Sequence, residues 1–222
     1  MSARRALVGP LVALVALLSA CTTSEEGLPD GGEALTRSAE TMSGIKSTHF
    51  VIKVDGELPD LGVQGADGDL NADGDAQGKA KVNQFGQLLE VDFVLAKGDL
   101  YIKGPTGGFT KLPAALAGQV YDPTSILNPD KGVAKVLRSV KDPKTTSADS
   151  ATQVVTGTVP KDVAAALVPG ISSDVAGTFT LDRASLKLQK AQFGLKGKDG
   201  KDASVEVALS EFDKLVKVSP PA

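Results

Sequence analysis

The chain has 222 residues and a formal net charge of −3, with 24 basic and 27 acidic side chains scattered along it. Because no basic stripe matches the phosphates of a nucleic acid, we expect no nucleic-acid partner. One cysteine and one histidine cannot supply an internal disulfide or the ligands of a structural zinc ion, so we expect no metal and no cofactor.

The N-terminus has the pattern of an export signal that ends at the only cysteine. Within residues 1–20, Arg4 and Arg5 precede an apolar run that is shorter than the roughly 20 apolar residues of a membrane helix. The end of this run, Leu18-Ser19-Ala20-Cys21, resembles the bacterial lipobox. That resemblance implies that the signal is removed and that Cys21 becomes a diacylglycerylated N-terminus. The alternative is an ordinary signal peptide that happens to end near a cysteine.

Residues 21–32 connect this anchor to the folded part. They are polar and contain proline and glycine without periodicity, which predicts a flexible tether. The tether spans about 18 Å on average and at most about 40 Å when stretched, so the domain stays near its membrane. Residues 33–222 contain no internal repeat or linker, and we expect them to form one domain.

The first half of this domain has the pattern of one helix followed by strands. Residues 33–46 place Leu35, Ala39, Met42 and Ile45 at helical spacing, which predicts an amphipathic helix. After it the apolar period changes to two, as in half-buried strands. The predicted strands cover residues 49–56, 62–72, 76–84, 88–96 and 100–103.

The second half alternates between helices and strands. Asp122 is a predicted N-cap before Pro123, and Asn128 is a predicted N-cap before Pro129. This order predicts an α+β fold, with a largely antiparallel sheet in a single domain. The remaining predicted elements are a short helix over 161–168, strands over 151–159, 175–182, 186–195, 203–209 and near 212–218, and a hairpin turn at Asp199-Gly200.

The segment from Asp69 to Gly74 matches the start of an EF-hand calcium loop. Such a loop needs a bidentate glutamate at its twelfth position, and that position here is Ala80. The flanking segments also have the period of strands rather than of helices. We therefore interpret the segment as an acidic hairpin turn.

Two motifs are weak candidates for catalysis. His49 has no Gly-x-Ser-x-Gly nucleophile elbow to accompany it, and Ser43 and Lys46 form a Ser-x-x-Lys without the companion motifs of penicillin-recognising enzymes. We therefore expect no enzymatic activity. The apolar faces of the strands and helices remain, and they form either a filled core or the wall of a cavity. Periodicity alone favours the filled core.

Several segments resemble the LppX/LprG/LprA/LprF family of mycobacterial lipoproteins. The most specific is residues 121–132, Tyr-Asp-Pro-Thr-Ser-Ile-Leu-Asn-Pro-Asp-Lys-Gly, and the others are 47–59, 68–70, 91–94, 204–212 and 216–221. The likeness extends from residue 30 to the C-terminus, although the loops between residues 145 and 200 are shorter here. It implies a strongly curved antiparallel β half-barrel with helices across its concave face, which together enclose an apolar cavity for acyl chains.

The resemblance also implies a function at the outer face of the plasma membrane, where Cys21 anchors the chain. Such proteins bind multi-acylated lipids or glycolipids, of the triacylglycerol or phosphatidylinositol mannoside type, and help to transfer them towards the outer cell envelope. A membrane lipid transporter is a candidate partner, and the chain is expected to act as a monomer. The alternative hypothesis is an anchored structural or interaction module with a filled core that docks a protein or a glycan.

Strand alternation and the resemblance together predict the residues that line the cavity. Ala80 aligns with the small residue of the family's third strand that lies against the cavity. The predicted lining comes from four strands and from the helix after Pro129: Phe50, Ile52, Val54, Ala80, Val82, Val91, Phe93, Leu100, Ile102, Val133, Val136 and Leu137.

Overall fold

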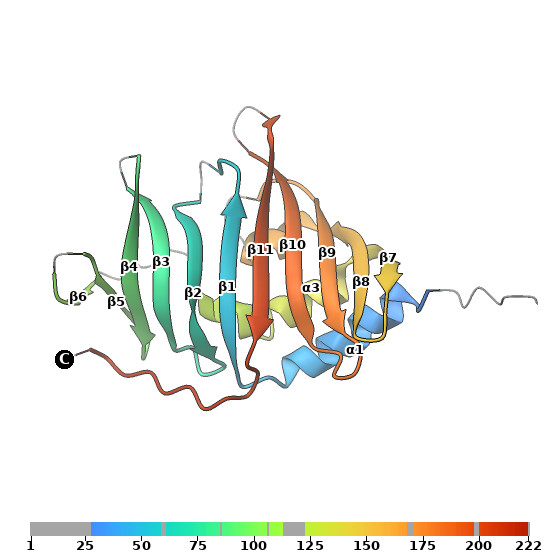
Figure 1. The fold of residues 1–222 in the computed structure, drawn as a ribbon, viewed down its shortest axis with the longest axis horizontal. Helices are drawn as coiled ribbons and strands as arrows, with labels where there is room; N and C mark the ends of the chain where they lie inside the picture. Colours follow the sequence, from blue (N-terminus) through green and yellow to red (C-terminus); the bar gives the residue numbers. More distant parts are fainter. Residues whose placement is uncertain are drawn as a thin grey trace, which may run out of the picture.

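The computed structural model describes residues 28–58, 61–84, 86–105, 107–112, 123–167, 171–197 and 200–221. Its centre is one 11-stranded sheet in which neighbouring strands are antiparallel. The strand order is β6-β5-β4-β3-β2-β1-β11-β10-β9-β8-β7, so the two halves of the chain meet where β1 pairs with β11. Figure 1 shows the helices gathered behind the sheet, on one of its faces.

The strands follow the chain in two antiparallel series. The first six are β1 Ser47–Asp55, β2 Val63–Asn71, β3 Ala76–Gln84, β4 Gln87–Ala96, β5 Asp99–Lys103 and β6 Thr110–Lys111. The last five are β7 Lys141–Ala148, β8 Thr152–Val159, β9 Val175–Asp182, β10 Leu188–Lys196 and β11 Asp202–Ser210. Apolar and polar side chains alternate along most of them because only one face of the sheet is buried.

Within the described residues, four helical segments accompany the sheet: α1 Gly31–Ser43, the 3-10 helix η1 Pro123–Leu127, α3 Val133–Ser139 and α4 Lys161–Leu167. Helix α1 starts at Asp30, whose Oδ1 accepts a hydrogen bond from the backbone N–H of Glu33 at 2.6 Å. It packs against α3 and against the edge strand β7, while η1 packs against β2. Within the described ranges, none of the helices has the length and apolar content that would let it cross a membrane.

The core lies between the sheet and these helices. Phe50 of β1, Phe179 of β9 and Phe193 of β10 are fully buried, and the rings of Phe179 and Phe193 meet edge to face with centroids 6.3 Å apart. Leu35 and Met42 project from α1 into the same cluster. The apolar stripe predicted for residues 33–46 therefore holds α1 on the sheet, since an isolated helix of this length is only marginally stable.

The predicted α+β fold with an antiparallel sheet is confirmed, and the sheet is open. The predicted strand near 212–218 is wrong. Glu211 and Asp213 take φ values of 51° and 62°, which end β11 at Ser210. The chain then continues as an extended tail, which runs along the lower ends of β1 to β4 in Figure 1.

Two other local differences have simple causes. The sequence does not predict β7, because KDPKTTSA carries no alternating apolar side chains and β7 is an edge strand with a single neighbour. Asn128 does not cap α3. Its Oδ1 accepts hydrogen bonds from the backbone N–H groups of Asp130 and Lys131 within a turn, and α3 begins at Val133 after Gly132. The predicted Asp122 cap and the Asp199 turn position lie outside the described residues.

Candidate functional site

The face of the sheet that the helices cover is called the inner face below. Residues that are directly paired in antiparallel strands project from the same face, so each row of pairs across the sheet lists neighbours on that face. Two adjacent rows carry most of the predicted cavity residues of the strands. The first runs through Leu209, Phe50, Gly68, Gly78, Phe93 and Ile102, and the second through Val207, Ile52, Ala66, Ala80 and Val91.

Small residues occupy the middle of both rows. Gly68 and Ala66 of β2 face Gly78 and Ala80 of β3, between large side chains on β1 and β4. A Cβ atom at either glycine would collide with a carbonyl oxygen of the facing strand. The two backbones therefore approach closely at this point. The same four residues leave a strip of the inner face without large side chains.

The structure brings the predicted cavity residues of the strands and of α3 together. All of them except Val82 and Val91 belong to one hydrophobic cluster, or pack against it. Those that are buried are Phe50, Ile52, Val91, Phe93, Leu100, Val133, Val136 and Leu137, and those that are half-buried are Val54, Ala80, Val82 and Ile102. That these residues line an acyl-chain cavity stays a prediction.

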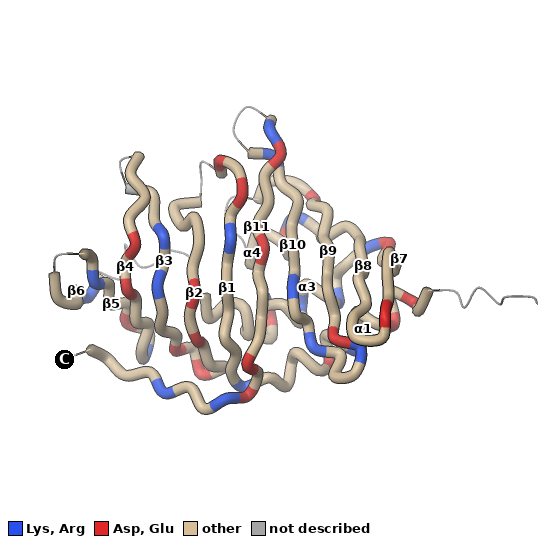
Figure 2. The backbone as a smooth tube through the Cα atoms, in the orientation of Figure 1, with Lys and Arg blue, Asp and Glu red and all other residues tan. Residues whose placement is uncertain are grey.

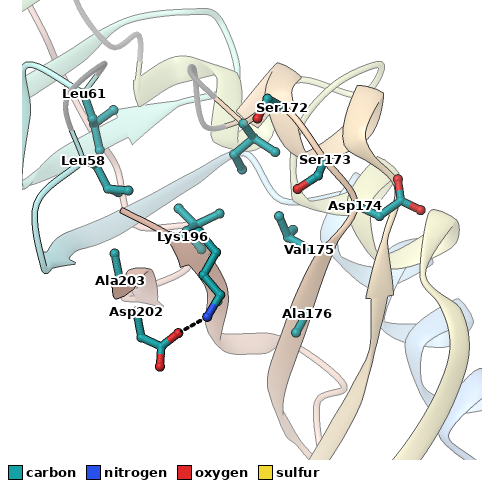
Figure 3. A pocket seen from close by; sticks show the side chains of 13 residues that line it. Leu58, Leu61, Ser172, Ser173, Asp174, Val175, Ala176, Lys196, Asp202 and Ala203 are labelled. Carbon is teal, nitrogen blue, oxygen red and sulfur yellow. Dashed lines mark hydrogen bonds and ion pairs between the residues drawn. The ribbon is translucent and has the colours of Figure 1, made fainter. Parts of the chain in front are cut away.

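An open cavity of about 490 Å³ lies at one end of the inner face, where β9 begins and β10 ends. In Figure 3, Leu58 and Leu61 approach it from one side and the stretch from Ser172 to Ala176 from the other. The lining consists of Leu58, Leu61, Ile171, Ser172, Ser173, Asp174, Val175, Ala176, Gly194, Leu195, Lys196, Asp202 and Ala203. We call this cavity the β9–β10 pocket.

The β9–β10 pocket has an apolar floor and a polar rim. Leu61, Ile171 and Val175 are at most 8% exposed and belong to the same cluster as Phe50 and Phe93. The rim residues are exposed: Ser172, Ser173, Asp174, Lys196 and Asp202. The pocket thus joins the apolar interior to water, as a site for an amphiphilic ligand would.

The charges at the rim are paired. Lys196 Nζ lies 2.5 Å from Asp202 Oδ1, and its hydrogen bond and charge lower the pKa of the Asp202 carboxyl. Asp174 accepts a hydrogen bond from the backbone N–H of Lys161 at 2.9 Å, and this bond, together with the charge of Lys141, lowers the pKa of Asp174. Both carboxylates are therefore ionised at neutral pH, each beside a lysine.

None of the predicted cavity residues lines the β9–β10 pocket, and sequence reasoning missed it. The pocket exists because the pairing of β9 with β10 stops at Ala176 and Gly194, while β10 continues beside β11 to Lys196. Alternation alone places Val175 and Leu195 on the inner face. The point where two paired strands separate depends on their register, however, and the sequence of either strand alone does not give that register.

The polar motifs lie away from both features. His49 sits on the outer face of the sheet, with Nδ1 3.0 Å from Asp69 Oδ1 and Nε2 3.7 Å from Asp67 Oδ1. Ser43 donates its hydroxyl hydrogen bond to the carbonyl oxygen of Glu40, one turn earlier in α1. His49 is thus paired with carboxylates on the outer face, and the hydroxyl of Ser43 bonds a backbone carbonyl of its own helix.

The segment from Asp69 to Gly74 forms the end of β2 and the turn into β3, as interpreted from the sequence. Asn71 Oδ1 accepts hydrogen bonds from the backbone N–H groups of Asp73 and Asp75, both at 3.0 Å, and Gly74 takes a φ of 94°. Among the described residues, no group of three or more His, Cys, Asp or Glu side chains is arranged to hold a metal ion.

Charges on the outer face are interleaved. Figure 2 shows Lys and Arg alternating with Asp and Glu from strand to strand. Ion pairs join adjacent strands, as Lys79 with Glu90 at 3.1 Å and Lys190 with Glu206 at 3.2 Å. Such exposed pairs stabilise the fold only weakly and keep this face polar.

Comparison with known proteins gives concordant matches. The model of the LppX_LprAFG lipoprotein family matches residues 30–218. Lipoarabinomannan carrier protein LprG of Mycolicibacterium hassiacum is 34% identical over 98% of this chain and 97% of its own length, and that of Mycolicibacterium smegmatis is 34% identical over 98% and 96%. The crystal structure of LprF from Mycobacterium bovis matches with a TM-score of 0.74 at 23% identity, covering 88% of this chain and all of that one. Mycobacterium tuberculosis lipoprotein LppX matches with a TM-score of 0.62 at 22% identity, covering 85% and 97%. These two structures share the fold.

Proposed function

Because the chain belongs to the LppX_LprAFG lipoprotein family, we propose that it is a membrane-anchored carrier of multi-acylated lipids or glycolipids. The observation that carries this proposal is the strip of small residues on the inner face. Gly68, Gly78, Ala66 and Ala80 place no large side chain on the inner face, between the large side chains of β1 and β4. The name of the relatives, lipoarabinomannan carrier protein, supports a glycolipid among the ligands.

The energy of exposed acyl chains explains why a carrier would need this architecture. Each buried methylene contributes about 0.8 kcal/mol, so one 16-carbon chain in water costs about 12 kcal/mol. An open apolar surface large enough to hold such chains would promote aggregation. A curved sheet with helices across its inner face can enclose them instead. Binding and release of this kind need no catalytic group.

The anchor restricts where the carrier acts. Thr145 donates a hydrogen bond to the carbonyl oxygen of Pro29 at 2.5 Å, and α1 begins at Gly31, so the chain is attached to β7 from Pro29 onwards. From Cys21 to this point the backbone spans at most about 29 Å. We propose that Cys21 is acylated, that lipid is loaded at the outer face of the plasma membrane, and that it is passed towards the outer envelope with the help of a membrane lipid transporter.

Mass spectrometry of lipid extracted from the purified protein tests the carrier proposal. The variant Ala80→Trp places a large ring in the strip of small residues, and we expect it to fold and to lose most of the bound lipid. The matched control is Lys81→Trp, since Lys81 is the next residue of β3 and projects from the exposed outer face. This control should keep the lipid of the natural sequence.

Two outcomes would contradict the proposal. The first is that protein of the natural sequence carries no lipid. The second is that Ala80→Trp unfolds at a much lower denaturant concentration than Lys81→Trp, because a filled core loses about 1–3 kcal/mol of stability when it is overpacked. That result would favour an anchored interaction module with a filled core.

A further inference from the structure

We infer that the β9–β10 pocket is the mouth at which the hydroxyl-rich headgroup of the bound lipid remains in water. This inference rests on the proposed carrier function and adds a second site to it, separate from the strip of small residues on β2 and β3. It assigns the pocket to sugar-like, uncharged headgroups. The argument depends on the parting of two strands, on the continuity of the apolar floor and on the groups that form the rim.

The parting of β9 and β10 provides the opening. The last pair between them is Ala176 with Gly194. Beyond it, Leu195 and Lys196 of β10 pair only with Ala203 and Asp202 of β11, and β9 pairs with β8 at Val175. The sheet is therefore split at this end, and the pocket occupies the split.

The floor of the pocket continues into the interior. On the inner face, the pair of Leu195 and Ala203 is the next one after Phe193 and Val205, and Val205 pairs with Val54. Val54 is one of the predicted cavity residues, so that set and the pocket are adjacent on the same face. An acyl chain lying along the inner face would meet apolar side chains without a break up to the pocket.

The rim suits hydroxyl groups better than a net charge. Within the described part of the chain, the hydroxyls of Ser172 and Ser173 are not bonded to other protein groups and can both donate and accept. The lysine and carboxylate charges at the rim neutralise one another, because Lys196 pairs with Asp202 and Lys141 with Asp174. A volume of about 490 Å³ also lies within the roughly 300–1,000 Å³ of typical ligand pockets.

A substitution at Gly194 can fill the mouth of the pocket. Gly194 is exposed, it lines the pocket, and a Cβ atom built on it would be 3.8 Å from its nearest neighbour, the Cβ of Ala176. Gly194→Trp therefore adds a ring at the mouth without straining the backbone. Gln192→Trp is the matched control, since Gln192 is exposed on the same face of β10, two residues earlier, and is outside the pocket.

The test compares binding of two probes with identical acyl chains, a diacylglycerol and its diglucosyl derivative, to delipidated full-length protein. We expect Gly194→Trp to bind the diacylglycerol within about twofold of the natural sequence and to bind the glycolipid about tenfold more weakly, which corresponds to the loss of a few hydrogen bonds. Gln192→Trp should bind both probes normally. The double variant Ser172→Ala, Ser173→Ala should weaken glycolipid binding selectively.

The outcomes separate this inference from the carrier proposal. If the natural sequence binds neither probe, the carrier proposal fails. If the natural sequence binds both probes, the inference is overturned when Gly194→Trp binds each probe with the same affinity as Gln192→Trp. Equal loss of both probes would also overturn the headgroup assignment, because the pocket would then hold acyl chains. Thermal unfolding of each variant confirms that it is folded.

Discussion

Gly68 of β2 faces Gly78 of β3 on the inner face of the sheet, and neither position has room for a Cβ atom. The facing backbones are so close there that a side chain at either glycine would collide with the backbone of the other strand. The pair also leaves the inner face of β2 and β3 without side chains at this point. The close approach of these two strands and the proposed space for acyl chains therefore depend on the same residues.

Replacing Gly78 by alanine should lower stability. The added methyl group meets the backbone of β2, which cannot move aside as a flexible side chain would, so we expect a loss of about 1–3 kcal/mol in the free energy of unfolding. Gly194→Ala is the control, since its Cβ has ordinary contacts only. It should leave stability unchanged or raise it by up to about 1 kcal/mol, because alanine is the better strand residue. Urea unfolding of the two variants measures the difference, and equal midpoints would refute the close contact.

The sequence predicts a strand correctly where one face of that strand is buried and the other is exposed. Strands β3 and β9 have the bounds that alternation predicts, because their inner-facing residues pack on the core while the others meet water. Alternation does not predict the edge strand β7, because Pro143 and its polar neighbours do not alternate between apolar and polar side chains. The resemblance implies a place against the cavity for Ala80 alone, and the strip around it depends on the pairing of β2 with β3. The β9–β10 pocket depends on where two strands part. That point is set by pairing between distant segments.

Asp30 should contribute to stability as the N-cap of α1. Its side chain bonds the free N–H of Glu33 at 2.6 Å, and the helix it starts supplies Leu35 and Met42 to the core. We expect Asp30→Ala to cost about 1 kcal/mol in chemical denaturation. Asp30→Asn, which keeps an acceptor oxygen, should cost only a fraction of that. If both substitutions cost the same, the hydrogen bond is not the cause.

The carboxylate of Asp174 should make stability depend on pH. The hydrogen bond from the backbone N–H of Lys161, and the charge of Lys141, lower its pKa from the ordinary value of 3.8. As pH falls, the unfolded chain takes up the proton first. The contribution is therefore complete above that value and is lost as pH falls through the folded-state pKa. We expect Asp174→Asn to unfold at a lower temperature than the natural sequence at neutral pH, and the difference to shrink in acid.

Asp162→Asn is the control for this pH experiment. Asp162 is exposed in the first turn of α4, one residue after Lys161, and accepts no hydrogen bond within the described ranges. Its effect on the unfolding temperature should change less between neutral and acidic pH. A parallel pH dependence for the two variants would show that general charge, and not the contact with Lys161, is responsible.

Cys21 should decide whether the protein stays on its membrane. Two acyl chains on one residue anchor a protein stably where one chain binds only marginally. We expect the natural sequence in the membrane fraction, with an N-terminal peptide that carries a diacylglyceryl group in mass spectrometry. Cys21→Ala should lack this modification, whereas Ser24→Ala, three residues further along, should retain it. An unmodified Cys21 in the natural protein would favour an ordinary signal peptide, and the reach of at most about 29 Å from the anchor would no longer limit where lipid is delivered.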